Sequence, residues 1–467
     1  MRHLFVSIVS LLVAIAPAAA QPGSETTRLT IRQAPAPVPA LKYQLLPPTD
    51  EMSPGNAVQA YYRAFSPDWF ANEPNAEQIN KALATPLSDL PRKELKAISN
   101  SAQLREVDLA ARREYCDWEM IERIKKEGIG LLLPDVQGLR QLATMLACRA
   151  RLEIADGQFD KATYTLRTGM AMGKHVGDAL TFINALVGVA ICQAMLKQVE
   201  ELIQAPNSPN LYWALAELPR PYIDLRASAQ AEKIVLLATI PALKDLAGGP
   251  LRPDQQKTLR NQVNYVAGIW EDGPNATPWR IQPGYPALVL MKQYPEAKRA
   301  LIAQGRTPDE VEAMPVVQVV LLRSLQQYER LRDDLFKWIP LPYWQASPGI
   351  ERLNKELLQA RDNFEGVPFI SLLPAIGKVC RTTARLDQRI AALRCVEAIR
   401  LYAAGHDGKL PASLSDIKEV PVPDDPMSGK PFDYKMDGNK AILSAAVSPT
   451  SAQSPENALR YELTLER

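Results

Sequence analysis

Apolar side chains recur at three- and four-residue spacing along most of this chain, and this spacing constrains its fold more than any other feature. The pattern is clearest from Asp135 onward, where one face carries Leu139, Leu142, Leu146, Ala150 and Ile154. Gly157 ends this helix, and two further helices are expected over residues 159–175 and 178–204. The last of these is apolar nearly all round, which predicts a place in the centre of a mainly α-helical domain.

Prolines divide the chain into helical segments. The sequence contains 39 of them, mostly between the apolar repeats, where they fix connections and stop helices. Asn56 precedes the first repeat and is expected to cap its N-terminus. The other expected helices cover residues 75–84, 100–126, 224–246, 254–270, 307–338 with a break at Pro315, 349–363 and 378–404.

The C-terminal part has a different pattern. After the helix over 378–404, residues 405–431 turn through several prolines, and two alternating runs follow at 432–436 and 440–445. Asp437 and Gly438 lie between the runs, a strong signal for a β-hairpin. The sequence therefore predicts an irregular array of helical hairpins followed by a small α+β module, in which a long helix precedes an antiparallel hairpin.

These patterns give a division of the chain into five parts. They are a signal peptide (1–20), a proline-rich extended lead that is only partly ordered (21–54), a helical domain (55–247), a second helical region with proline-rich connectors (248–375) and the α+β module (376–467). Residues 41–46 are considered as an edge strand within the lead.

The C-terminal segment, residues 380–460, resembles the globular end of type II secretion pseudopilins. The matching residues are Gly408, Pro411, Leu414, Asp425, Pro426, Gly429, Pro431 and Tyr434. The resemblance implies one long helix packed on a small antiparallel sheet. Pilus assembly is not implied, because nearly 400 residues precede the module where a pseudopilin has its hydrophobic assembly helix. Pseudopilins often hold calcium, which suggests oxygen ligands at Asp425, Asp433, Asp437 and Asn439, although calcium needs six to eight converging oxygens.

Two further resemblances lie in the helical part. Gly157, Phe159 and Ala162 match the junction of a tetratricopeptide repeat, so residues 135–175 resemble one hairpin of that family. No 34-residue recurrence surrounds it, so we expect a single hairpin and not a regular solenoid. Residues 209–226 and 310–325, with the C-terminal module, resemble a family of uncharacterised secreted bacterial helical proteins, which implies no activity.

The N-terminus has the three regions of a secretory signal peptide. Arg2 precedes an apolar run from Leu4 to Ala16, and small residues follow, so we expect cleavage after Ala20 and a periplasmic or secreted protein. No later apolar run reaches the roughly 20 residues of a transmembrane helix, so no membrane anchor is expected. With 54 Lys and Arg against 52 Asp and Glu, and no block of like charge, nucleic acid is a poor candidate partner.

Few residues have the spacing of a chemical site. Ser415 and Lys418 satisfy S-x-x-K, but the companion motif K-T-G is absent, and an exposed helical turn is the favoured interpretation. His175 and His406 are expected at helix ends, where a cationic histidine is favourable. Acidic runs at 332–334 and 423–426 do not by themselves distinguish a catalytic pair from a solvated face. No catalytic residue, cofactor or metal ligand is therefore assigned.

For the cysteines and the aromatic clusters, a structural role is the favoured interpretation. The cysteines are Cys116, Cys148, Cys192, Cys380 and Cys395, an odd number without a disulfide framework, and buried core positions are favoured. The aromatic residues Tyr212, Trp213, Tyr222, Trp338, Tyr343 and Trp344 lie beside prolines, where they either lock loops onto helices or line a recognition groove.

Three functions remain open from the sequence. The first is an exported, non-enzymatic helical scaffold that binds a protein or peptide, of undetermined oligomeric state. The second is an envelope hydrolase with a carboxylate-based site between the helical and C-terminal parts. The third is an oligomeric structural component. An enzyme should present a pocket with converging ionisable side chains, whereas a scaffold should present a groove without them.

Overall fold

The computed structural model describes residues 26–65, 73–127, 135–271, 285–362, 369–373, 375–445 and 459–466, and it confirms a mainly α-helical chain with a small sheet. The α-helices are α2 (Ala57–Ala64), α4 (Glu73–Ala84), α5 (Arg92–Ser99), α6 (Ala102–Ala111), α7 (Met120–Glu127), α8 (Asp135–Ala155), α9 (Phe159–Gly177), α10 (Phe182–Gln204), α11 (Tyr212–Ala216), α12 (Leu225–Thr239), α13 (Pro253–Glu271), α14 (Tyr285–Ala303), α15 (Pro308–Ala313), α16 (Val316–Phe336), α17 (Tyr343–Asp362) and α18 (Ile376–Gly405). Short 3₁₀ turns are η1 (Thr49–Glu51), η2 (Leu87–Asp89), η4 (Pro241–Asp245), η6 (Phe369–Leu372) and η7 (Leu414–Asp416).

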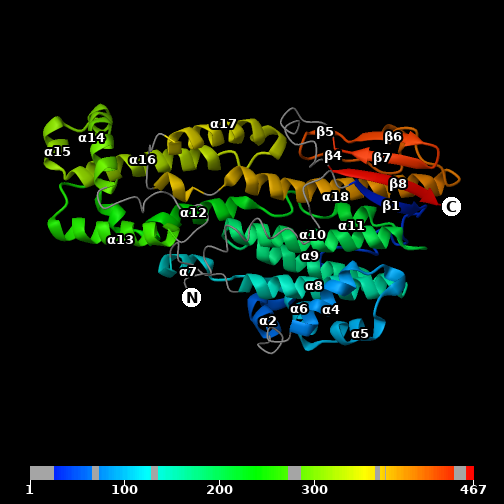
Figure 1. Ribbon diagram of the computed structural model, residues 1–467. Coiled ribbons are helices and arrows are strands. Elements are labelled where there is room, and N and C mark those ends of the chain that lie inside the picture. The colour runs from blue at the N-terminus through cyan, green and yellow to red at the C-terminus, as the bar shows by residue number, and fades with distance from the viewer. Residues whose placement is uncertain are drawn as a thin grey trace.

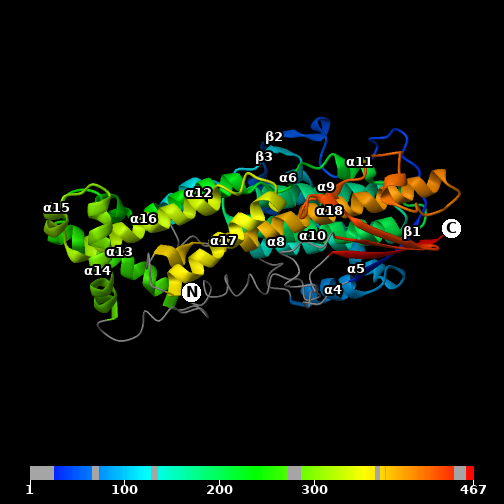
Figure 2. The same ribbon diagram turned by 90° about the horizontal axis from the view of Figure 1, so that it is seen from above.

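The molecule is elongated. Figures 1 and 2 show the sheet at one end, with α13, α14 and α15 at the other. Helices α8, α9 and α10 lie between α18 and the N-terminal helices α2 to α6 (Figure 1). We refer to α13–α17 as the arm, because these helices extend away from the α8–α10 core in both views.

Helices α9 and α10 form the centre of the core through a close backbone contact. A methyl group on Gly188 of α10 would lie 2.5 Å from the carbonyl oxygen of Gly173 and 2.5 Å from Cα of Gly177, both on α9. Only glycine allows two backbones to approach this closely. Among the described helices, α10 is the one long and apolar enough to cross a membrane, but 67% of its most apolar stretch is buried inside the protein. It is the central helix that its sequence predicts.

Most expected helices are confirmed, and one is wrong. Asn56 caps α2, its side chain accepting from the Val58 amide at 3.2 Å, and Thr307 and Glu310 form the expected capping box at α15. The helix expected over 100–126 is instead interrupted by strand β3 (Arg113–Tyr115), which pairs with β2 (Ser53–Asn56). Asn56 also bonds the backbone of Asp117 at both N and O, so a distant contact overrides the local helical pattern.

The sheet differs from the predicted hairpin by including both ends of the described chain. Its order is β1-β8-β7-β6, formed by β1 (Thr26–Arg32), β8 (Arg460–Glu466), β7 (Lys440–Ser444) and β6 (Asp433–Asp437). Strands β6 and β7 form the expected hairpin, with Gly438 at φ +61° in its turn, and β8 continues it antiparallel. Strand β1 then pairs with β8 in parallel register from Thr26↔Arg460 to Arg32↔Glu466. A separate two-stranded piece contains β4 (Asp424–Asp425) and β5 (Lys430–Pro431).

Within the lead expected over 21–54, residues 26–32 form an extended strand that belongs to the sheet of the C-terminal module. Leu29 and Ile31 alternate with more exposed side chains and are buried, as Tyr461, Leu463 and Leu465 are on β8. Residues 41–46 form no strand, although Leu45 is buried. Parallel pairing between the two ends of a chain leaves no local signal, which is why the sequence division at residue 376 misses β1.

Buried ionic contacts hold the sheet and α18 against the core. Glu200 of α10 pairs with Arg389 of α18 (Nη2 to Oε2, 2.8 Å) and accepts from the Tyr461 hydroxyl of β8 at 2.5 Å. Farther along α18, the Arg400 guanidinium pairs with Glu397 at 2.8 Å and donates to the carbonyl oxygen of Arg32 at 2.9 Å. These contacts join α10, α18, β1 and β8 into one unit.

Candidate functional site

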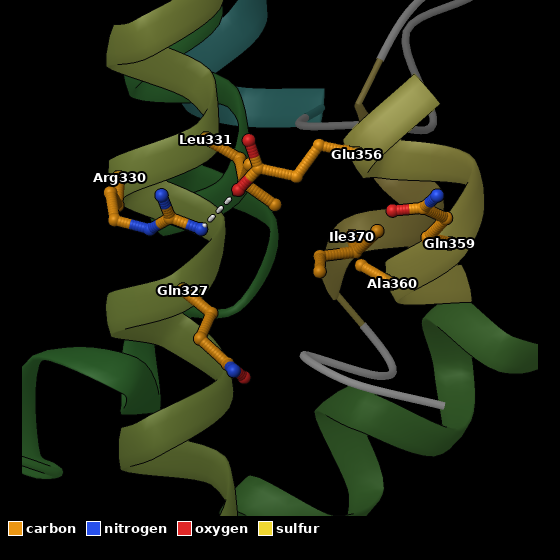
Figure 3. Close-up of a pocket in the computed structure, with 7 residues that line it drawn as sticks. All are labelled: Gln327, Arg330, Leu331, Glu356, Gln359, Ala360 and Ile370. Carbon is orange, nitrogen blue, oxygen red and sulfur yellow. Dashed lines mark hydrogen bonds and ion pairs between the residues drawn. The ribbon is translucent and has the colours of Figure 1, made fainter. Parts of the chain in front are cut away.

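A cleft in the arm is the candidate site. It lies between α16 and α17 beside η6 and encloses a cavity of about 130 Å³. Figure 3 shows the residues that line it, which are Gln327, Arg330, Leu331, Glu356, Gln359, Ala360 and Ile370. Because α16 and α17 each present one turn of side chains to the gap, spacings of three and four residues bring these groups to the same face.

An ion pair closes one end of the cleft. Glu356 reaches from α17 across to Arg330 on α16, with Nη2 2.8 Å from Oε1 (Figure 3). Arg330 also lies 3.7 Å from a carboxylate oxygen of Asp334. Both side chains of the pair remain about half-exposed, so the contact adds little to stability and its charges neutralise each other.

Two glutamine side chains supply the unused polar groups of the cleft. Gln327 projects from α16 into the gap at the end away from the ion pair, and Gln359 lies on the α17 side (Figure 3). Within the described chain neither carboxamide makes a hydrogen bond. Each therefore retains an acceptor oxygen and an NH₂ donor that a bound molecule can use.

A larger set of ionisable side chains meets elsewhere, on the N-terminal side of the core. We call it the ionic cluster; it contains Glu51, Asp108, Arg112, Arg149, Glu153 and Arg167, from η1, α6, the end of α6, α8 and α9. Arg149 holds Asp108 with two bonds of 2.8 and 2.7 Å, and Arg112 and Arg167 both bond Glu51, at 2.9 and 2.5 Å.

Charge in the ionic cluster is internally compensated. Burial alone would raise the pKa of Glu51, but hydrogen bonds from Arg167 and Arg112 outweigh it and lower that pKa. Burial raises the pKa of Glu153, against a hydrogen bond from Thr165 at 2.6 Å. Since each described carboxylate has a partner from another element, the cluster ties helices together. The sequence shows opposite charges four residues apart in and beside α6 and α8. In the structure these side chains bond residues of other elements instead of each other.

Two other carboxyl groups have strongly raised pKa values. Burial raises the pKa of Asp387 on α18 to about 6 and that of Glu232 on α12 to about 7. Asp387 accepts the backbone amide of Tyr222 at 2.9 Å, which holds the loop before α12 against α18. Carboxyl groups with shifted pKa values can mark either active sites or structural contacts. In the described chain no hydrogen bond joins these two groups, so they do not form an acid–base pair.

The S-x-x-K residues do not form a serine–lysine pair. Lys418 Nζ donates to the backbone oxygen of Ser415 at 2.6 Å, and the Ser415 hydroxyl contacts Ser413 at 2.7 Å instead. All three residues lie around the exposed turn η7. The structure therefore agrees with the exposed-turn interpretation.

The two histidines differ. His406 caps the end of α18, stacking on Tyr402 with ring centroids 3.8 Å apart and donating from Nδ1 to the Tyr402 carbonyl at 2.9 Å. His175 lies at the end of α9, but burial lowers its pKa to about 4, and its Nδ1 lies 2.9 Å from the Tyr61 hydroxyl. The expected cationic role is therefore wrong for His175, which is neutral at neutral pH because tertiary burial outweighs the helix dipole.

Burial of His175 predicts a loss of stability in mild acid. The unfolded pKa is about 6.5 and the folded pKa about 4, so the unfolded chain binds the proton more readily between these values. The stability contributed by neutral His175 should therefore be lost as the pH drops from 6.5 towards 4, by up to about 3 kcal/mol, whereas the raised pKa values of Glu232 and Asp387 shift the free energy of unfolding in the opposite direction. Urea unfolding of the parent and of His175→Gln at pH 7 and pH 4.5 isolates the His175 contribution, because the parent should lose more stability in acid, or gain less, than the variant. An equal pH dependence in both chains would contradict the assignment.

The suggested calcium ligands do not converge. Asp425 is buried, where its Oδ1 accepts from Gln388 at 2.9 Å and from the Met427 amide at 2.8 Å. Asp433 and Asp437 are exposed at opposite ends of β6, and Asn439 donates to the Leu465 carbonyl at 3.3 Å. Among the described residues, no group of three or more His, Cys, Asp or Glu side chains is placed to hold a metal ion.

The acidic run at 332–334 lies on a solvated, paired surface. Asp333 pairs with Arg332 at 3.0 Å and with Lys233 at 3.6 Å, and Asp334 pairs with Lys337 at 2.6 Å. These are ordinary helix-surface contacts. In the other run, at 423–426, Asp425 is the buried residue described above.

The aromatic residues mainly lock loops. Tyr212 and Tyr222 are fully buried, and their hydroxyls donate to the carbonyl oxygens of Pro421 and Met170. Trp344 is 44% exposed, but its ring packs on Gly429 in the β4–β5 turn. All five cysteines are free thiols, and burial raises the pKa of each.

Comparison of the chain with protein-family models, with curated proteins and with solved structures finds no match. The resemblances to a tetratricopeptide hairpin and to pseudopilins therefore rest on the residues quoted for them and stay predictions.

Proposed function

We propose that the chain is an exported, non-enzymatic helical scaffold of the cell envelope that binds a protein or peptide. The observation that carries the proposal is the contrast between the ionic cluster and the cleft. The clustered ionisable groups bond each other, whereas the cleft offers Gln327 and Gln359, whose carboxamides make no hydrogen bond within the described residues. Unused neutral hydrogen-bond groups at the surface favour binding over proton-transfer chemistry. Export rests on the signal-peptide pattern of residues 1–20, which lie outside the described residues.

One carboxyl group supports the alternative function, an envelope hydrolase. Asp387 has its pKa raised to about 6 and lies on α18, between the helical core and the C-terminal module. Hydrolysis by carboxylates needs a second group within reach of the same substrate. The contact of Asp387 with the Tyr222 amide gives it a structural role, so the scaffold is the better-supported function.

Site-directed photocrosslinking tests the proposal. Leu358 is 57% exposed on α17, next to Gln359, and Tyr115 is 54% exposed on β3 near α2. A photoreactive amino acid at the Leu358 position should crosslink a specific protein from envelope extract, whereas the same group at Tyr115 should not. Light scattering of the purified chain gives its own oligomeric state for comparison. Identical crosslinked species from both positions, or none from either, would contradict the proposal.

A further inference from the structure

We propose, on the basis of the function proposed above, that the α16–α17 cleft binds the main chain of an extended peptide at a residue with a small aliphatic side chain. The inference rests on the hydrogen-bond groups of the cleft, its charge balance and its size. Each limits the ligand in a different way.

The free carboxamides match a peptide group. A peptide unit presents one N–H donor and one C=O acceptor, and a glutamine side chain presents the complementary acceptor and donor. Gln327 and Gln359 come from different helices, so each can bond a main chain that lies between them. This is recognition of backbone and does not by itself select a sequence.

The charge balance of the cleft favours a neutral ligand. Arg330 and Glu356 bond each other at 2.8 Å, and they are the charged side chains among the described residues that line the cavity. Because the two charges neutralise each other, a charged ligand would gain little net attraction at the cleft. A main-chain segment is neutral and leaves the ion pair intact.

The size and the apolar wall limit the side chain. The cavity of about 130 Å³ is close to the roughly 150 Å³ that accommodates a benzene-sized molecule in a protein interior, so it holds about six non-hydrogen atoms. Leu331, Ala360 and Ile370 are buried and form its apolar wall. Alanine with an adjoining peptide group fits this volume, whereas a larger side chain with its peptide group exceeds it.

Blocked pentapeptides provide the test. The probes are Ac-Gly-Gly-Xaa-Gly-Gly-NH₂ with Ala, Val, Phe or Asp as Xaa, and saturation-transfer NMR with the full chain measures binding. The Ala probe should bind at least about fivefold more tightly than the Phe and Asp probes, with the Val probe weaker than the Ala probe. The double variant Gln327→Leu/Gln359→Leu should weaken Ala-probe binding about tenfold or more, as expected from the loss of two hydrogen bonds.

Two further variants make the result specific. Gln345→Leu changes an exposed glutamine of α17 that does not line the cavity and should leave binding unchanged. Ala360→Leu fills the apolar wall and should abolish binding while circular dichroism stays that of the parent. Retained binding in both cleft variants, equal binding of all probes, or binding of none would overturn the inference. A specific crosslink at Leu358 without peptide binding would leave the scaffold function standing and remove only this ligand class.

Discussion

Gly188→Ala is expected to lower the free energy of unfolding by about 3 kcal/mol or more, because it places a methyl group between two backbones. The new Cβ would lie 2.5 Å from the Gly173 oxygen and from Cα of Gly177, and backbone atoms cannot move aside as side chains can. Helices α9 and α10 would have to separate at the centre of the core. Urea unfolding followed by circular dichroism measures the change.

A glycine in open space supplies the control for that substitution. A Cβ at Gly249 meets nothing within 4 Å, so Gly249→Ala should change the free energy of unfolding by no more than about 0.5 kcal/mol. Equal urea midpoints for the two variants would show that α9 and α10 do not pack as closely as described.

Arg400→Met is expected to lower the free energy of unfolding by about 3–5 kcal/mol, since it leaves the carboxylate of Glu397 buried without its partner. Arg400 and Glu397 are 1% and 0% exposed. The guanidinium also donates to carbonyl oxygens of Arg32, Ser208 and Pro209, at 2.9, 3.1 and 3.2 Å, which would lose their donor. Denaturant unfolding with a fluorescence probe reports the change.

Two matched variants separate the buried charge from the other contacts of Arg400. The double variant Glu397→Met/Arg400→Met removes both charges and should recover part of the lost stability, the remainder reflecting the carbonyl oxygens. Arg28→Met breaks the exposed contact of β1 with Glu462, 3.2 Å in length, and should cost less than about 1 kcal/mol. A loss for Arg400→Met as small as for Arg28→Met would refute the role given to the buried pair.

The local part of this fold is predictable from its sequence. Helical spacing and capping residues act within a few positions, so Asn56, Thr307 and the apolar faces of α8–α10 indicate helices correctly. The helix expected over 100–126 fails because β2, about 60 residues away, captures residues 113–115. The pairing of β1 with β8 is missed for the same reason, since it joins residues more than 400 positions apart.

The candidate site was not predictable in this way. Gln327 and Gln359 are common surface residues at helical spacing, and nothing local distinguishes them from solvated side chains. They matter only because α16 and α17 approach each other beside η6, which is a matter of tertiary packing. Two local features were predicted correctly: Ser415 lies in an exposed turn and His406 lies at the end of a helix.

Because β1 pairs with β8, this sheet can form completely only after residues 460–466 have been synthesised. Residues 26–32 emerge from the ribosome long before their strand neighbour, residues 460–466. Closing so long a loop is entropically slow, and until it closes β1 has an open edge towards other chains. A product that ends before residue 460 would keep that edge open, so the sheet reports whether synthesis has passed β8.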